Sequence, residues 1–121
     1  MAYPVVPTFN NEIQMQAFCC TWFWNEFPVL RRLLHTNNNN SVNRIEGAAN
    51  KSMGVVRGVS DCEFVDYGVV WFLEFKMPGK KQEPEQIDFM IKVQDRGQRY
   101  LILYSFEDFY KFIAKRVATY E

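Results

Sequence analysis

Two charged residues lie on a stretch that otherwise has the composition of a buried β-strand. Residues 69–76, VVWFLEFK, are rich in β-branched and aromatic side chains, which predicts a strand. Because side chains alternate across a strand, Glu74 and Lys76 share one face with Phe72. Burying a carboxylate and an ammonium is costly unless they are paired or bind something. The pattern therefore indicates either a structural ion pair, which is common on strands, or a site for a charged ligand.

The preceding hairpin brings a third charged group, Asp61, to this pair. If Tyr67-Gly68 form the turn, the numbers of two paired residues add up to 135, so Asp61 lies opposite Glu74. Cross-strand neighbours have Cβ atoms roughly 4.5–5.5 Å apart, so two carboxylates repel there unless a cation lies between them. Such oxygen ligands suit Mg²⁺ or Mn²⁺, and Lys76 could orient a water or stabilise a phosphoryl charge. A register shifted by one residue would put Asp61 on the other face.

Three short motifs follow one another along this part of the chain: GVSD, which ends at Asp61, then LEFK, and then PEQIDF at a helix start. Together they resemble the PD-(D/E)xK nuclease superfamily and, within it, the VRR-NUC family. The upstream segments HTNNN and KSMGVVRGVSD are similar to the family's loop and its glycine-rich approach to the aspartate. The resemblance spans roughly residues 10–115. Ser60 stands where the family usually has proline, which affects the backbone more than the chemistry.

The resemblance implies a role for each matching residue. Asp61 and Glu74 would bind the metal, and Lys76 would be the catalytic lysine. Gln86 would assist in the active site, and Glu12 would be the acid of the first helix. The helix dipole favours a carboxylate in a first turn whatever its function, so Glu12 also has a purely structural interpretation.

The helix that carries Gln86 supports its role independently of the family. Gln86 shares a stripe with Met90 and Val93 at positions i, i+4 and i+7, which favours a place on the side facing the sheet. The alternative is an exposed polar residue in the first helical turn.

The elements that position these residues are predicted from turn and capping signals. An extended arm over residues 1–9 precedes a helix from Asn10 or Asn11 to about Asn25. A helical turn over 29–34 leads to a short strand at 34–36, and a weak helical pattern covers 41–53.

The hairpin is then followed by a helix, a strand and a helix. The first helix starts at Pro84 and stops at Gly97, the strand covers 99–104, and Ser105 with Asp108 caps the last helix. A right-handed crossover should make the strands at 69–76 and 99–104 parallel. We expect a single α/β domain over 1–121, with a restriction-endonuclease-like mixed sheet flanked by helices and an αβββαβ core.

The net charge is zero, but basic residues are concentrated in one segment. Residues 31–57 contain five basic side chains against one acid, Glu46, which predicts a phosphate-contacting surface. A solvated basic face without a ligand is the alternative. The basic loop after Lys76 and the only histidine add further candidates, so the predicted DNA contacts are Arg44, Lys51, Arg57, Lys80, Lys81 and His35.

Composition excludes several protein classes. No apolar run approaches 18 residues, so no segment is expected to span a membrane, and the N-terminus lacks a signal-peptide pattern. The three cysteines form neither a zinc spacing nor an even disulfide framework. Reduced thiols in the cytoplasm of a bacterial or phage-infected cell are therefore expected.

The sequence as a whole predicts a metal-dependent DNA nuclease that uses Mg²⁺ or Mn²⁺. The resemblance and the small size favour a structure-selective endonuclease acting on branched, flapped or four-way junction DNA. A catalytically silent DNA-binding module and a protein-interaction domain are the alternatives. Three Trp and eleven Phe exceed what one small core readily buries, so we also expect a homodimer formed through the aromatic cluster at 22–27.

Overall fold

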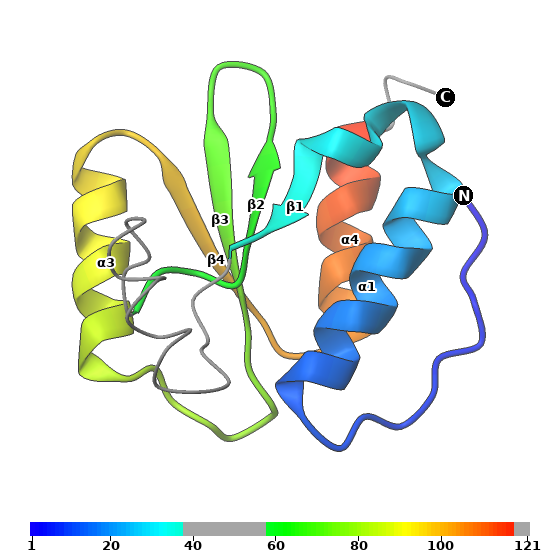
Figure 1. Ribbon diagram of the computed structural model, residues 1–121, viewed down its shortest axis with the longest axis horizontal. Helices are drawn as coiled ribbons and strands as arrows, with labels where there is room; N and C mark the ends of the chain where they lie inside the picture. Colours follow the sequence, from blue (N-terminus) through cyan, green and yellow to red (C-terminus); the bar gives the residue numbers. More distant parts are fainter. Residues whose placement is uncertain (38–57, 118–121) are drawn as a thin grey trace, which may run out of the picture.

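A four-stranded sheet forms the centre of the computed structural model, which describes residues 1–37 and 58–117. The strand order is β1-β2-β3-β4. Helices α1 and α4 lie on one side of the sheet and α3 on the other (Figure 1). This mixed sheet flanked by helices is the α/β fold that the sequence predicts. The predicted helix at 41–53 lies outside the described residues.

Helix α1 spans Glu12–Glu26 and begins where the sequence predicts, because the Asn11 side chain accepts a hydrogen bond from the Gln14 amide. A 3-10 helix, η1, covers Pro28–Leu33 and leads directly into strand β1, Leu34–Thr36. Of the described helices, none is long and apolar enough to cross a membrane.

The hairpin of β2 (Cys62–Val65) and β3 (Val70–Phe75) has the predicted register. Cys62 pairs with Leu73 and Val65 pairs with Val70, so the numbers of two paired residues add up to 135, as expected. The Asp66 amide donates to the Val69 carbonyl at 3.0 Å, which closes the turn around residues 67–68. The turn chemistry therefore identified the register correctly.

Helix α3 (Pro84–Asp95) connects β3 to strand β4 (Arg99–Leu103), and the two strands are parallel as predicted. Helix α4 spans Phe106–Val117. Its first turn is fixed by Ser105, whose hydroxyl accepts from the Asp108 amide, and by Asp108, whose carboxylate accepts from the Tyr104 amide. These contacts match the predicted cap.

The core lies between the sheet and the α1–α4 layer, and it accommodates more aromatic side chains than composition suggested. None of the Trp or Phe residues, all of which fall in the described ranges, is among the exposed large hydrophobics. Trp22 packs against Phe27, Phe106 and Phe109 of the same chain. Most of the 22–27 cluster is thus packed within the chain, although Trp24 is only partly buried, and the homodimer expected through this cluster stays a prediction.

The N-terminal arm also packs against this layer. The Tyr3 ring contacts the rings of Phe106 and Tyr110, and the Tyr110 hydroxyl donates to the Met1 carbonyl at 2.9 Å. The three cysteines are free and buried, and the Cys20 and Cys62 sulfurs lie 3.8 Å apart.

Candidate active site

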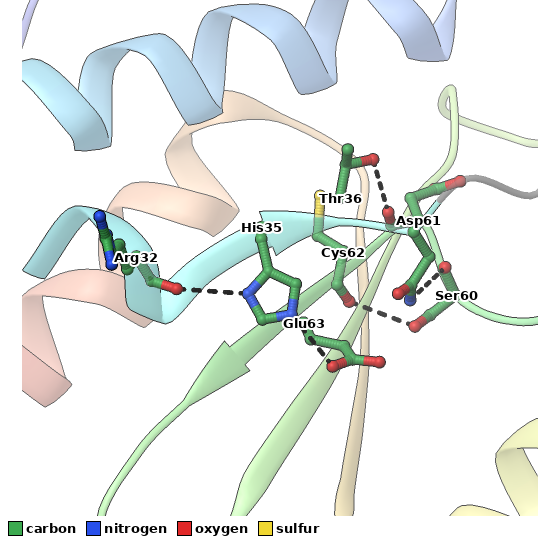
Figure 2. Close-up of polar contacts among 8 residues, drawn as sticks. Arg32, His35, Thr36, Ser60, Asp61, Cys62 and Glu63 are labelled. Carbon is green, nitrogen blue, oxygen red and sulfur yellow. Dashed lines mark hydrogen bonds and ion pairs between the residues drawn. The ribbon is translucent and has the colours of Figure 1, made fainter.

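Asp61 stands immediately before β2, at the end of the sheet where β3 ends. Continuing the β2–β3 register by one pair places it opposite Glu74. Its Oδ2 accepts a hydrogen bond from the Phe75 amide at 2.7 Å, which ties the carboxylate to β3. Its backbone carbonyl accepts two hydrogen bonds. One comes from the Thr36 hydroxyl at 3.0 Å, as Figure 2 shows, and the other from the backbone N–H of Asn37 at 2.8 Å. Asp61 is thus fixed between β1 and β3.

The segment that leads to Asp61 lies unusually close to the start of α3. Gly58 has a φ of 83°, and a Cβ added there would lie 2.6 Å from the Cβ of Glu85. Only glycine fits this position without displacing backbone. Ser60, which replaces the expected proline, is fully buried, and its hydroxyl donates to the Cys62 carbonyl at 3.2 Å. The substitution therefore supplies a local hydrogen bond instead of a rigid ring.

Glu74 is a buried carboxylate with one oxygen paired. The Tyr100 hydroxyl donates to Oε1, whereas Oε2 makes no hydrogen bond within the described residues. Burial raises the pKa of Glu74, and the nearby charge of Asp61 raises it further, against the opposing effects of Tyr100 and Lys76. An orphaned buried oxygen of this kind is costly and is expected where a ligand completes the contacts.

Lys76 is nearly buried, at 9% exposure, beside the two carboxyl groups. Burial raises the pKa of Asp61, while the Phe75 hydrogen bond and the Lys76 charge act in the opposite direction. Among the described residues, none of the ion pairs within 4 Å involves Lys76. The lysine is therefore not held as a direct ion-pair partner of Glu74, the structural alternative that its sequence context allowed.

Glu12, the first residue of α1, also contributes to this site. Its negative charge is close enough to raise the pKa of Asp61, after the larger effect of burial. Helices α1 and α3 both begin at the end of the sheet where β3 ends (Figure 1). The partial positive charges of both helix N-termini therefore lie at this end of the sheet, which favours anions there.

Gln86 lies in the first turn of α3, where its side-chain oxygen serves the helix. It accepts from the Glu83 amide at 2.7 Å, as half of a capping box at the start of α3. Gln82 instead reaches the site, since its amide donates to the Tyr100 hydroxyl at 3.4 Å. Neither Tyr100 nor Gln82 was predictable from the sequence, because their proximity to Glu74 depends on how β4 aligns with β3.

The predicted DNA contacts divide into three groups. His35 lies on β1, with Nε2 3.2 Å from Glu63 Oε2 and Nδ1 3.3 Å from the Arg32 carbonyl (Figure 2). Lys80 and Lys81 are exposed, directly after a turn in which the Lys80 amide donates to the Met77 carbonyl. The other three, Arg44, Lys51 and Arg57, lie outside the described residues.

The donor set suits a hard divalent cation. Residues 1–37 and 58–117 contain no group of three or more His, Cys, Asp or Glu side chains that could hold a metal. Mg²⁺ is commonly bound by one or two carboxylates, with water and substrate phosphate completing its shell. Asp61 and Glu74 supply that number, and the orphaned Oε2 of Glu74 supplies an oxygen for such a contact.

Comparison with known structures identifies the fold. A structure described as "VRR_NUC domain protein" matches 93% of this chain and 92% of its own, with a TM-score of 0.72 and 16% identity. A second, described as "VRR_NUC domain", matches 84% and 92%, with a TM-score of 0.54 and 21% identity. No protein-family model and no curated protein matches the sequence. The chain has the VRR-NUC fold, as its motifs predicted.

Proposed function

We propose that this chain is a metal-dependent DNA endonuclease that hydrolyses phosphodiester bonds. The observation that carries the proposal is the buried Glu74 carboxylate, which has one unpartnered oxygen and lies beside Asp61 and Lys76 on a VRR-NUC fold. A folded protein that retains such a costly arrangement is expected to use it.

Each residue has a distinct part in the proposed reaction. A Mg²⁺ or Mn²⁺ held by Asp61 and Glu74 would supply positive charge at the scissile phosphate and make water more acidic. Lys76 stabilises the negative charge that develops on the phosphoryl oxygens. Tyr100 orients Glu74 through its hydroxyl, and the Phe75 amide orients Asp61. Glu12 adds negative charge beside Asp61, which strengthens the attraction for a cation.

We further propose that the substrate is branched, flapped or four-way junction DNA. A domain of 121 residues has little surface for reading sequence. Two symmetric cuts across a junction need two active sites, so a homodimer is the expected working form. Since most of the aromatic cluster is used internally, this dimer proposal rests on the resemblance of the sequence to the VRR-NUC family, whose small stand-alone members look like junction-resolving nucleases. Light scattering at micromolar concentration should give twice the mass of 14.4 kDa, and a monomeric mass with and without branched DNA would contradict it.

The proposed activity is tested by incubating the protein with duplex, flap and four-way junction DNA, with Mg²⁺, Mn²⁺ or EDTA. Cleavage is expected only with a divalent cation, and it should be lost in Asp61→Asn, which keeps the shape of the side chain. Salt-sensitive binding without cleavage would instead identify a silent DNA-binding module. Absence of both would favour a protein-interaction domain. Equal cleavage by Asp61→Asn would refute the assigned site.

A further inference from the structure

A groove runs along one face of α1 and opens beside the candidate active site. Its volume is about 400 Å³, and it is lined by α1 residues that include Ile13, Ala17 and Trp24. Thr36 at the end of β1 and Asp61 close its other wall. Asp61 therefore belongs both to the proposed metal site and to the groove, so whatever occupies the groove is continuous with the reacting phosphate.

The chemistry of the groove differs from that of a phosphate-binding surface. Of the described residues that line it, Asp61 alone is ionisable apart from the buried thiol of Cys20. The wall is otherwise apolar or neutral and hydrogen bonding, as where the Gln16 amide donates to the Thr36 hydroxyl at 3.0 Å. An uncharged, partly apolar molecule with hydrogen-bonding edges fits such a wall, and a nucleobase has these properties.

A cation stands at the far end of the groove. The exposed Arg31 guanidinium lies 5.1 Å from the centroid of the Trp24 ring. Trp24 is itself held in place, because its indole nitrogen donates to the Leu34 carbonyl at 3.0 Å. From Ile13 to Trp24 the helix rises about 16 Å. The order along α1 is therefore a carboxylate site, a neutral groove, an aromatic ring and then a positive charge.

We infer that this groove binds an unpaired nucleotide of the substrate strand next to the scissile phosphate, with its base against Ala17 and Trp24 and a following phosphate near Arg31. The inference rests on the proposed nuclease function and specifies its substrate. A volume of about 400 Å³ is typical of a pocket for one small molecule. It admits a single-stranded segment and not a duplex, which gives a physical reason for preferring DNA that is unpaired at the cut.

The test blocks the groove without touching the catalytic groups. Ala17 is exposed on α1, so Ala17→Phe fills the groove at little cost in folding, and Asn25→Phe places the same ring on an exposed α1 position outside the groove. Three quantities are measured: cleavage of a flap substrate, hydrolysis of bis(p-nitrophenyl) phosphate, and binding of a fluorescein-labelled thymidine hexanucleotide. Binding is measured in a Lys76→Ala background with Mn²⁺, so that the oligonucleotide stays intact.

Ala17→Phe should lower flap cleavage and hexanucleotide affinity by about ten- to a hundredfold, the range expected when base stacking is lost. Hydrolysis of bis(p-nitrophenyl) phosphate should stay within about twofold, as should all three quantities in Asn25→Phe. Arg31→Gln should reduce the salt dependence of hexanucleotide binding by about 0.7 in log–log slope.

Normal flap cleavage and normal hexanucleotide binding by Ala17→Phe would overturn the groove assignment. The proposed function fails separately: a wild-type protein that cuts neither flap DNA nor bis(p-nitrophenyl) phosphate is not a nuclease. Hexanucleotide binding that is still blocked by Ala17→Phe would, in that case, support the groove as a single-strand site without catalysis.

Discussion

The helices on the two sides of the sheet bury very different groups. Helix α4 buries five apolar side chains, Phe106, Phe109, Phe112, Ile113 and Val117, whereas no residue of α3 is fully buried. Strand β3 repeats this division: Phe75 packs against Phe109 of α4, and Phe72 on the other face packs against Phe89 of α3. The buried charges, Glu74 and Lys76, share the face of Phe72.

This division separates the closely packed core from the buried charges of Glu74 and Lys76. The α1–α4 layer supplies a dry, closely packed core, and its free energy offsets the cost of desolvating a carboxylate and an ammonium on the α3 side. A site built this way can retain an incompletely satisfied Glu74 without unfolding the domain. Matched substitutions can test whether the α4 side contributes mainly to stability and the α3 side mainly to the proposed activity.

The largest effect is expected from removing an aromatic ring on the α4 side. Phe109 is fully buried, so Phe109→Ala should lower the free energy of unfolding by about 3–5 kcal/mol. Phe89→Ala is the matched change on α3, where the ring is only partly buried, and it should cost less than half as much. Urea denaturation measures both. Equal losses would show that the α3 layer stabilises the fold as much as the α4 layer does.

Lys76→Ala should affect cleavage strongly and stability little, the opposite of what is expected for Phe109→Ala. Losing an electrostatic contact to the transition state costs on the order of 10²–10³ in rate, while DNA affinity and the urea midpoint should change little. Lys111→Ala, on the exposed surface of α4, is the control for loss of one lysine charge. The rate of cleavage under single-turnover conditions is measured for Lys76→Ala and Lys111→Ala, and only Lys76→Ala should be slow. Near wild-type cleavage by Lys76→Ala would make Lys76 a structural residue and remove it from the mechanism.

Local signals in the sequence predicted the hairpin geometry well. The register follows from a two-residue turn and strand periodicity, both of which depend on neighbouring residues. The placement of Asp61 opposite Glu74 could therefore be derived from the sequence alone. The starts of α1 and α4 were predictable for the same reason, because a side chain adjacent in sequence caps the N-terminus of each helix.

Non-local contacts were beyond such reasoning. Tyr100 meets Glu74 only because the α3 crossover sets the alignment of β4 on β3, and nothing adjacent in sequence encodes that alignment. The stripe on α3 predicted that Gln86 faces the sheet, but it could not reveal that the Gln86 oxygen caps the helix or that Gln82 reaches Tyr100. Composition likewise could not show that none of the Trp and Phe side chains is left exposed.

Gly58→Ala tests how closely the α3 side constrains the approach to Asp61. The new Cβ would meet Glu85, and the positive φ adds strain, so a loss of stability of roughly 2–3 kcal/mol and reduced cleavage are expected. Gly97→Ala is the control, because Gly97 has a φ of 80° but open space around its Cβ position. It should cost about 1–2 kcal/mol without affecting cleavage. Equal losses in the two variants would show that the contact with Glu85 is unimportant.

The smallest of the expected effects is that of Glu74→Gln on stability in protein kept free of divalent cations. Unlike the other substitutions, it should raise the stability of the fold. Burial raises the pKa of Glu74, so the folded state holds the proton more tightly than the unfolded state. The stability that protonation gives is complete below the unfolded pKa and is lost as the pH rises through the folded pKa. Metal-free wild-type protein should therefore lose stability as the pH rises across that window, and Glu74→Gln should lose less.

At neutral pH, Glu74→Gln should raise Tm by about 3–5 °C, the response of a domain of this size to roughly 1 kcal/mol. In a separate assay with Mg²⁺ or Mn²⁺ present, the same variant should not cleave DNA. Glu63→Gln serves as the control and should not raise Tm. It is the same kind of change, two residues from Asp61, but the Glu63 carboxylate pairs with exposed His35. Thermal denaturation at several pH values in EDTA measures both variants. A Tm for Glu74→Gln at or below that of wild type would mean that the α3 side bears no desolvation cost at Glu74, and the contrast between the two faces would then be one of packing alone.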